Sequence, residues 1–425
     1  MAEQTVEMKE NNQNPLTRYR RHIFLFLAVL GPSVITTMAG NDGAGVITYS
    51  YAGAHLGYGA LFLLPILTIL YGISQEMGSR AAIVTGKGLG DIIRERFGIK
   101  VAFFAFAALL VANFGTLLTN FAALKTAGAM LNIPPTAFLV VTILFCFSLV
   151  TFTRYEKSQK IFLTGIVFYL AYVFSAYKIH PDWTVAVQSL FIPPSNIFSP
   201  NYLIIAVAVL GTTITPWGQF FIQSYMKDKN VPVSRLSYAK LESYLGAFIS
   251  NFFTFFIIAA TAATLYAFGM PLESGEQAAI AIRPFAGSLA SFLFALGLIN
   301  AALIGIVIVS LTSAYAFTEF FGFTGSLDEP FKRGPIFYSL FLINLIGAAF
   351  CVLTPFFPLF KIVLYTQSLN GILLPLFFYF LIKILNDKEL MGKYVNSRGQ
   401  NIFAVASTVV IAVCGVAAVA MSVLS

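Results

Sequence analysis

The sequence predicts an all-α integral membrane protein with eleven transmembrane helices. Of its 425 residues, 58% are hydrophobic and only 10% are charged, and the mean hydropathy is +0.82. A helix needs about 20 apolar residues to cross a bilayer, so the chain has room for roughly eleven crossings. Stretches such as 102–112 and 203–210 are apolar at every position, whereas the strands of a membrane barrel alternate polar and apolar residues. A helical bundle is therefore expected.

The expected helices follow one another along the chain with short connections. They lie near residues 23–54, 58–79, 101–124, 136–152, 161–178, 201–225, 242–268, 288–316, 334–353, 358–384 and 401–423. Residues 1–21 are polar and charged, and they are expected to form a cytoplasmic tail. The stretch 85–98 has the composition of an amphipathic connector on the inner face.

The basic residues predict the orientation of the bundle. With the N-terminus inside, all but four of the 26 lysines and arginines fall on the inner side, the exceptions being Lys125, Lys178, Arg283 and Lys361. This bias predicts a cytoplasmic N-terminus and an extracellular C-terminus. The net charge of +8 therefore reflects the membrane topology. The lipid bilayer is the expected surrounding, and neither a nucleic acid nor an obligate protein partner is expected. A compact chain with short loops fits a prokaryotic plasma membrane.

Two of the expected helices contain stretches that should unwind at mid-membrane. The first contains the sequence GNDGAG at 40–45, and the sixth contains GTTITPWG at 211–218, where proline removes a backbone donor. Interrupted first and sixth helices point to two inverted five-helix repeats with a substrate site between them. The predicted repeats are residues 22–180 and 200–385, with 400–425 as an eleventh, additional helix.

Asp42 is the acidic residue expected deepest in the membrane. A carboxylate at the centre of a membrane helix costs on the order of 3 kcal/mol, so its presence suggests a function. One interpretation is structural, because Asp at a helix start accepts backbone hydrogen bonds. The other is that Asp42 binds a cation, since no lysine or arginine is expected at the same depth. A metal ion is the simplest such partner.

Oxygen donors are expected to surround Asp42. Thr212, Thr215 and Gln367 are candidate metal ligands together with Asp42, because these oxygens favour Mg²⁺, Ca²⁺ or Mn²⁺ over softer ions. Mg²⁺ dehydrates reluctantly, so a site with one carboxylate suits an ion that keeps most of its water. The transported substrate is then Mg²⁺ or Mn²⁺, and no cofactor is expected. The side chains expected to line the cavity are Asn41, Thr213, Trp217, Gly218 and Gln219.

These residues carry a resemblance to a known family. The stretch GPSVITTMAGNDGAGVITYSYAGAHLGYG resembles the first helix of the NRAMP divalent-metal transporters, and GTTITPWGQFFIQS resembles their sixth. Gln367 and Pro375, and the stretch TSAYAFTEFFGF, are similar too. The resemblance implies a LeuT-type fold and matches Asp42 to the family's metal-binding aspartate. It places Gly45 where the family has a metal-binding asparagine, so that side chain is missing here.

The sixth helix departs further from the family pattern. Aligning proline with proline places Thr215 at the family's methionine and Trp217 at its histidine, whereas an ungapped alignment places Pro216 and Gly218 there. Both alignments remove the thioether and the imidazole. This set of departures resembles the NRAMP-related magnesium transporters, and the loss of the methionine implies a selectivity that is wider or shifted toward hard ions.

The expected third helix has no acidic residue. Classical members of the family carry acids there for proton movement, whereas residues 101–130 contain none and have Thr116 and Thr119 near those places. We therefore expect import of a largely hydrated divalent ion by alternating access, without proton coupling. An inside-negative potential contributes about 4.6 kcal/mol per 100 mV to the entry of a dication.

The alternatives to metal transport are the transport of organic solutes, enzymatic activity and a channel. Transporters of amino acids or similar organic solutes use the same type of fold, but Asp42 would repel a substrate carboxylate. A membrane enzyme is not expected, because the sequence has no Ser-His-Asp set, no pair of buried acids and no histidine-rich cluster. A channel is the third alternative, because the sequence does not report the rate of transport.

Overall fold

The computed structural model describes residues 31–153, 155–270, 272, 275–354 and 359–424, in which the regular secondary structure is helical and short loops join the helices. Its principal helices are α3 (Pro32–Ala39), α4 (Gly43–Leu56), α5 (Leu63–Thr85), α6 (Leu89–Phe97), α7 (Ile99–Met130), α8 (Pro135–Phe152), α9 (Tyr155–Ile166), α10 (Leu170–Ile179), α11 (Trp183–Gln188), α12 (Pro200–Thr213), α13 (Pro216–Asp228), α14 (Leu236–Thr261), α15 (Gly275–Phe321), α16 (Pro335–Leu353), α17 (Leu359–Asn386), α18 (Lys388–Met391) and α19 (Arg398–Leu424). Short tight turns, η1 (Gly57–Phe62) and η2 (Val167–Tyr169), join α4 to α5 and α9 to α10. The expected tail 1–21 lies outside the described residues.

Ten helical runs in the described residues are long and apolar enough to cross a membrane. One of them, Gly43–Thr85, spans 43 residues and contains both α4 and α5, which are separated by a turn at η1. Ten runs are therefore compatible with eleven crossings, in which α3 and α4 share the first. The all-helical membrane fold is confirmed.

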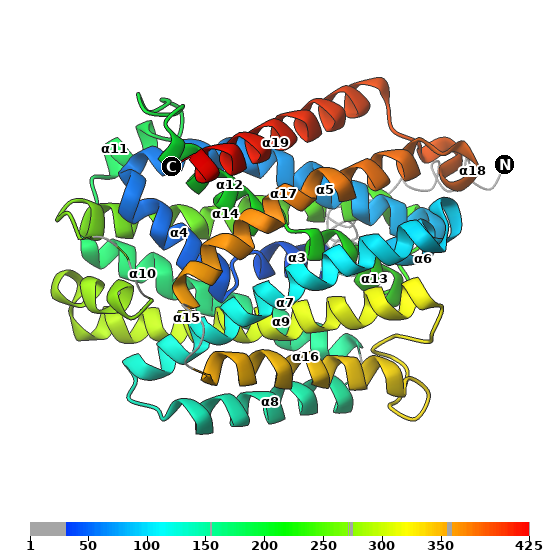
Figure 1. Ribbon diagram of the computed structural model, residues 1–425, viewed down its shortest axis with the longest axis horizontal. Helices are drawn as coiled ribbons and strands as arrows, with labels where there is room; N and C mark the ends of the chain where they lie inside the picture. The colour runs from blue at the N-terminus through cyan, green and yellow to red at the C-terminus, as the bar shows by residue number, and fades with distance from the viewer. Residues whose placement is uncertain (1–30, 154, 271, 273–274, 355–358, 425) are drawn as a thin grey trace, which may run out of the picture.

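Both predicted helix breaks are present. α3 ends at Ala39 and α4 begins at Gly43, while α12 ends at Thr213 and α13 begins at Pro216. At each break the chain continues in the same direction. Each pair of half-helices therefore forms one crossing (Figure 1). The expected eighth helix, 288–316, is longer than predicted, since α15 extends from Gly275 to Phe321.

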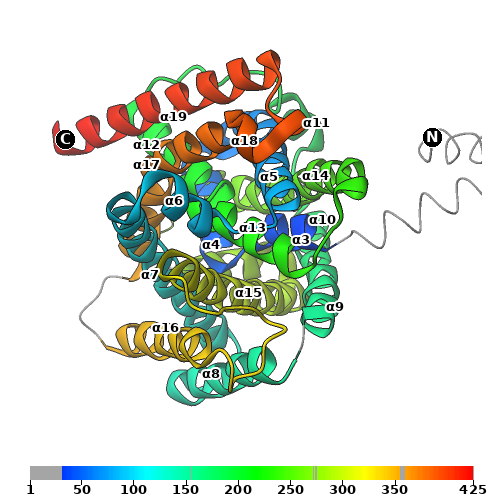
Figure 2. The same ribbon diagram turned by 90° about the vertical axis from the view of Figure 1, so that its right-hand side faces the viewer.

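The packing of the helices follows the pairing that an inverted repeat requires. The second, third and fourth crossings of the first half are α5, α7 and α8, and they contact the matching crossings α14, α15 and α16 of the second half. The view down the bundle shows α3, α4 and α13 in the middle, with α8, α16 and α19 at the periphery (Figure 2). The two broken crossings therefore lie at the centre of the molecule.

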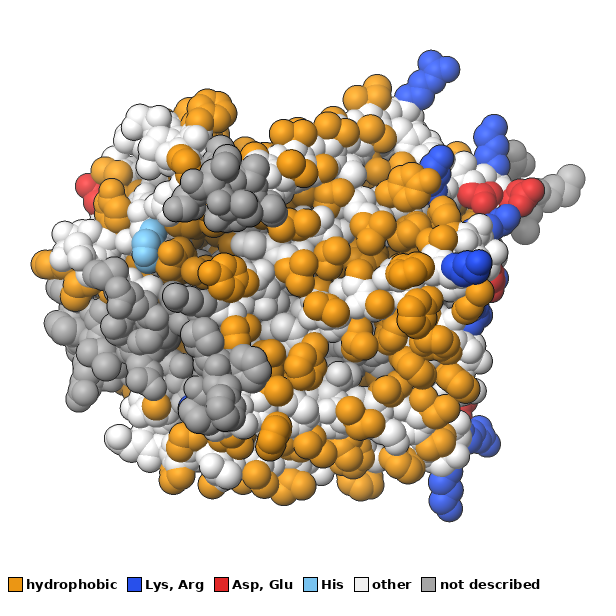
Figure 3. Space-filling model, in the orientation of Figure 1, with side chains coloured by type: hydrophobic (Ala, Val, Ile, Leu, Met, Phe, Trp, Pro, Cys, Tyr) orange, Lys and Arg blue, Asp and Glu red, His pale blue; other side chains and the backbone are white. Residues whose placement is uncertain are grey.

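Charge is distributed unevenly along the bundle. In the space-filling view, hydrophobic side chains cover the middle of the visible face, and lysines and arginines gather at the end where α6 and α18 lie (Figure 3). We call this end the basic end. The connector 85–98 contributes α6 there, with Leu89, Ile92 and Ile93 buried as an amphipathic helix requires.

Candidate functional site

The two helix breaks meet in the interior. The hydroxyl of Tyr49 on α4 lies 3.0 Å from the hydroxyl of Thr213 at the end of α12. A Cβ atom placed on Gly40 would lie 3.3 Å from the carbonyl oxygen of Thr213, so the two unwound backbones are close neighbours. Thr215 begins α13 by accepting the N–H of Gly218 over 3.0 Å. Each break is thus followed by a capped half-helix.

Asp42 caps α4, and amides hold its carboxylate on both sides. Oδ1 accepts the N–H of Gly45 at 2.7 Å, and Oδ2 accepts Nδ2 of Asn120 on α7 at 2.7 Å. Oδ1 of Asn120 in turn accepts the N–H of Gly43 at 2.9 Å. Asp42 is only 2% exposed, so this carboxylate is closed to solvent in the structure. Asp42 therefore has the capping role, and within the described residues amides and the helix dipole balance its charge.

A line of amide groups extends from Asp42 to α17. Asn120 also donates to the carbonyl of Thr116, whose hydroxyl accepts from Asn370 at 3.0 Å. Asn370 donates as well to Oε1 of Gln367 at 2.9 Å. Within the described residues, Nε2 of Gln367 and Oδ1 of Asn370 are buried without a hydrogen-bond partner. Gln367 is therefore connected to Asp42 through Asn370, Thr116 and Asn120 rather than by a direct hydrogen bond.

Two glycines let the backbones close around Asp42. A Cβ on Gly305 of α15 would lie 2.4 Å from Oδ1 of Asn120 and 2.6 Å from Cβ of Asp42. A Cβ on Gly45 would lie 2.4 Å from the carbonyl oxygen of Gly40. Because real Cβ atoms do not approach so closely, an asparagine at position 45 would not fit this backbone. Glycine at position 45 is therefore required by the close approach of the Gly40 carbonyl.

Asn41 lies beside Asp42 but points away from it. Its Nδ2 donates to the carbonyl of Ser250 at 2.8 Å, and its Oδ1 accepts from Thr254 at 2.8 Å, both on α14. All of these groups are buried. The amide of Asn41 therefore anchors the break to α14 instead of facing Asp42.

Buried polar groups continue from the breaks along α5 and α13. Gln75 on α5 has no partner for either amide atom in the described part of the chain, and neither Oε1 of Gln219 nor Nε1 of Trp217 has one. Nε2 of Gln219 makes a long contact of 3.4 Å to the hydroxyl of Ser74. Buried polar atoms without protein partners are usually satisfied by water. Polar side chains therefore line the space between α5 and α13. They include Gln219, which was predicted to line a cavity, and Gln75, which was not.

Gln75 and Asn370 were not among the residues predicted from the sequence. Both are neutral amides inside long apolar helices, α5 and α17. The signal that could have found them is the one used for Gln367, a polar side chain with no expected partner at membrane depth. Among the described residues, no group of three or more histidine, cysteine, aspartate or glutamate side chains is placed to hold a metal. Asp42 with surrounding amide and hydroxyl oxygens is the candidate that remains.

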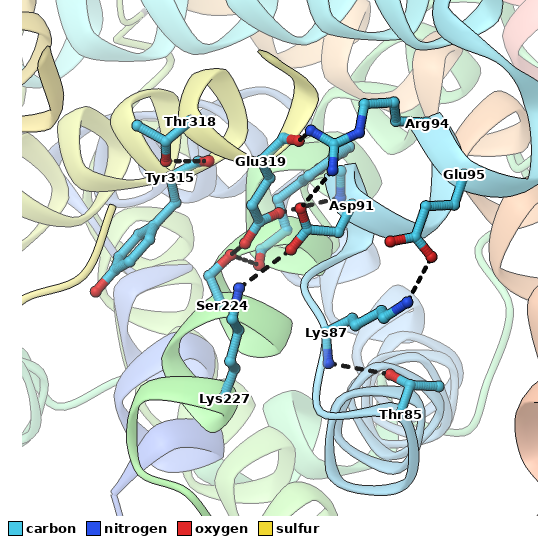
Figure 4. A network of polar contacts seen from close by, with 12 residues as sticks. Thr85, Lys87, Asp91, Arg94, Glu95, Ser224, Lys227, Tyr315, Thr318 and Glu319 are labelled. Atoms are coloured by element: carbon cyan, nitrogen blue, oxygen red, sulfur yellow. Dashed lines mark hydrogen bonds and ion pairs between the residues drawn. The ribbon is translucent and has the colours of Figure 1, made fainter. Parts of the chain in front are cut away.

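Acidic side chains tie the half-helices together at the basic end. Glu319 of α15 accepts from the hydroxyl of Ser224 on α13 at 2.7 Å and from the N–H of Gly90 on α6 at 3.1 Å. Asp91 on α6 binds Lys227 on α13 at 3.1 Å (Figure 4). These contacts join α6 to α13 and α15. A network of ion pairs and hydrogen bonds therefore closes this end of the bundle.

Glu242 of α14 holds the start of α3 at the same end. Its Oε1 accepts the backbone N–H groups of Gly31, Ser33 and Val34 at 2.6, 3.1 and 3.2 Å. The side chain is fully buried. A carboxylate at a helix N-terminus satisfies amides that lack partners within the helix, so α3 is fixed to α14 by this contact.

Comparison with known proteins identifies the family. Residues 33–421 match the family described as natural resistance-associated macrophage protein-like. The chain is 25% identical over 416 residues to the divalent metal cation transporter MntH of Erwinia tasmaniensis, covering 93% of this chain and 95% of that protein. It is 24% identical over 394 residues to MntH of Caldanaerobacter subterraneus, covering 89% and 90%.

Solved structures share the fold. The manganese transporter of Eremococcus coleocola, solved with an aromatic bis-isothiourea compound, superimposes with a TM-score of 0.75 at 17% identity, covering 92% of this chain and 85% of that one. MhsT in complex with L-phenylalanine superimposes with a TM-score of 0.61 at 14% identity, covering 92% and 98%. The match of the family model over nearly the whole chain shows that this protein belongs to the NRAMP family, and its MntH relatives are named as divalent metal transporters and not as enzymes.

Proposed function

We propose that this protein imports Mg²⁺, and also Mn²⁺, as a largely hydrated ion through the site at Asp42. The observation that carries this proposal is the pairing of Asp42 with Asn120, a buried anion next to oxygen-bearing amides and hydroxyls. No histidine or methionine side chain makes a hydrogen bond to Asp42 in the described residues. Oxygen donors favour hard dications, which supports Mg²⁺ over softer metals.

The ligands proposed are Asp42, Thr212, Thr215 and Gln367, with Gly45 contributing backbone only. Asn120 joins them, because its amide already contacts the carboxylate. The amide hydrogens that now satisfy Asp42 would give way when an ion binds, since a dication attracts a carboxylate more strongly than a neutral amide does. The unpartnered amide atoms of Gln367 and Asn370 could then contact the water that the ion retains.

Buried amide side chains between the breaks and the basic end support a path for the hydrated ion. The buried amides of Gln75, Gln219 and Gln223 have atoms with no partner in the residues described. Water between α5 and α13 would satisfy them. Release on that side requires the Glu319 and Glu242 contacts to open, which fits alternating access around a central site.

Movement of the ion without protons is supported by the composition of α7. Residues 101–130 contain no acid, and Thr116 and Thr119 donate their hydroxyls to backbone carbonyls within α7. The membrane potential alone supplies about 4.6 kcal/mol per 100 mV for a dication, so a second ion is energetically unnecessary.

The orientation proposed is N-terminus inside and C-terminus outside, in a prokaryotic plasma membrane. The gathering of lysine and arginine at the basic end supports it, because basic residues concentrate on the cytoplasmic side (Figure 3). The contacts of α5, α7 and α8 with α14, α15 and α16 support repeats near 22–180 and 200–385, with 400–425 outside them.

Flux in proteoliposomes tests the function. Under an inside-negative potential, Mg²⁺ should enter vesicles that hold the parent protein, and the lumen should not acidify. Asp42→Asn should abolish entry. Asp182→Asn is the matched control, since Asp182 caps α11 through Val185 in the same way but is exposed outside the core. Unchanged Mg²⁺ flux in Asp42→Asn would reject the site, and Mg²⁺-dependent acidification would reject uncoupled transport.

A further inference from the structure

A groove on the outer surface of the bundle lies between α8, α9 and α15. It encloses about 380 Å³ and is lined by the apolar side chains Phe145 and Leu149 of α8, Phe168 of η2 and Leu303 of α15, among others. All three walls belong to runs that are long and apolar enough to cross the membrane. The groove therefore faces the hydrocarbon part of the bilayer, where lipid is the available occupant.

Two lysines stand at one end of this groove. Lys157 and Lys160 both line it, both are exposed, and neither forms an ion pair within the described part of the chain. They lie near the start of α9. α7 begins next to α6 and α8 returns from its far end, so the start of α9 is at the basic end. The groove thus has a cationic mouth and an apolar body.

A second apolar groove on the same surface provides a comparison. It lies between α5, α12 and α19, encloses about 410 Å³, and has no lysine or arginine in its lining. Acyl chains can cover both grooves equally well. Of these two grooves, only the α8–α9–α15 groove has unpaired lysines in its lining.

We propose that the α8–α9–α15 groove binds one anionic phospholipid. Lys157 and Lys160 contact the phosphate of its headgroup, and one acyl chain lies along Phe145, Leu149 and Leu303. Basic pockets between membrane helices select anionic headgroups, because each lysine near the surface contributes about 1 kcal/mol of attraction. The hydroxyl of Thr164 and the amide of Asn300 also line the groove, and they donate to the carbonyls of Lys160 and Gly165 within the protein.

The bound lipid would pack behind two elements that hold the metal site. Leu303 and Ile304 line the groove, and the next residue of α15 is Gly305, which packs against Asp42 and Asn120. Tyr169, next to the groove residue Phe168, donates its hydroxyl to the carbonyl of Asn41 at 3.0 Å. Occupancy of the groove should therefore stabilise the folded bundle against heat.

Lipid titration of the full chain in a neutral detergent tests the proposal, with bound lipid counted by native mass spectrometry and thermal unfolding recorded in parallel. The parent should bind phosphatidylglycerol more tightly than phosphatidylcholine and gain thermal stability from it. Lys157→Gln with Lys160→Gln should lose about thirtyfold in affinity for phosphatidylglycerol, the value for two lost lysine contacts. Its binding of phosphatidylcholine, in which the choline offsets the phosphate charge, should change much less.

Two further variants separate charge from shape. Lys332→Gln with Lys388→Gln removes the same charge from exposed sites outside the groove and should bind phosphatidylglycerol like the parent. Thr164→Trp fills the groove and should weaken both lipids. Equal phosphatidylglycerol binding by the parent and the Lys157/Lys160 variant would overturn the proposal. Competition by glycerol phosphate at the concentration at which the intact lipid competes would overturn it too, because the site would then be one for a free anion.

Discussion

Asn120 donates its amide to the Asp42 carboxylate over 2.7 Å and accepts the N–H of Gly43 through its other end. One side chain of α7 thereby satisfies the charge and the backbone of the break in the first crossing. A buried carboxylate without a basic partner is costly, and charge-assisted hydrogen bonds reduce that cost. The pair explains how the anion is kept in the membrane interior.

Exchanging the two residues tests whether the pair acts as a unit. In Asp42→Asn combined with Asn120→Asp, residue 42 donates to residue 120, and the N–H groups of Gly43 and Gly45 keep their acceptors. We expect Asp42→Asn alone to lose at least about tenfold in Mg²⁺ affinity, because a charge-assisted contact is worth about 1.5–3 kcal/mol. The double variant should recover part of that loss, as measured by isothermal titration.

The control for the exchange is Asn120→Asp alone, which adds a second acid next to Asp42. The two carboxylates would repel each other, so it should destabilise the metal-free protein more than the double variant does. Equal Mg²⁺ affinity in the single and double variants would contradict the idea that the charge can be moved within the pair.

A sulfur atom at the sixth-helix break should change the metal preference. Thr215→Met introduces a thioether directly before α13. Because thioether sulfur is a soft ligand, it favours transition metals. We expect the ratio of Mn²⁺ to Mg²⁺ uptake to rise about tenfold, as a gain of about 1.4 kcal/mol for one ion would give. Competition between the two ions in vesicles measures that ratio.

Thr215→Leu is the matched variant, because it also removes the capping hydroxyl that accepts from Gly218 but adds no sulfur. Both variants should lose about 1 kcal/mol of stability with the cap. If Leu and Met shift the ratio equally, pocket size and not sulfur chemistry decides the preference at this position.

Adding a methyl group at Gly305 should damage the site by crowding. The Cβ of Gly305→Ala would meet Asn120 at 2.4 Å and Asp42 at 2.6 Å, so α15 must shift. Overpacking of this kind costs about 1–3 kcal/mol, and we expect lower thermal stability together with reduced Mg²⁺ uptake. Gly347→Ala in α16 is the comparison, since its Cβ would meet Phe114 at an ordinary 3.5 Å. That variant should be neutral or more stable, and an equally harmful effect there would remove the steric explanation.

Neutralising Glu242 should loosen the start of α3. Glu242→Gln keeps an acceptor oxygen for the three amides but loses the charge that favours a helix N-terminus, an effect of up to about 2 kcal/mol. Backbone amides at 33–36 should exchange hydrogen faster, as measured by mass spectrometry. Glu329→Gln, in the loop before α16, should leave that exchange unchanged. Unaltered exchange in Glu242→Gln would show that the carboxylate charge does not hold α3.

Much of the fold could be predicted from local composition. The runs of apolar residues correspond to α5, α7, α8, α16 and α17, because a bilayer leaves helices few alternatives for satisfying backbone groups. Both breaks were found by their glycine and proline content, and Asp42 by its charge. The length of α15 was underestimated, since polarity near residue 275 hides a helix that continues beyond the expected span.

The candidate site was predicted less completely. Thr215 and Asn41 were grouped as neighbours of Asp42, but Thr215 is occupied as a helix cap and Asn41 binds Ser250 and Thr254. Asn370 and Gln75 were not singled out. The direction of a side chain from an unwound segment depends on backbone angles that residue types alone do not fix.

The sequence by itself determined a membrane bundle with two interrupted crossings and a lone central acid, because apolar length, helix breakers and an uncompensated charge are local properties of the chain. Only the tertiary structure decided which groups reach that acid. Asn120 lies 78 positions from Asp42, and Gly305 contacts both from another helix. Such contacts arise from how closely helices far apart in the chain can pack, and that depends on all of their surfaces together.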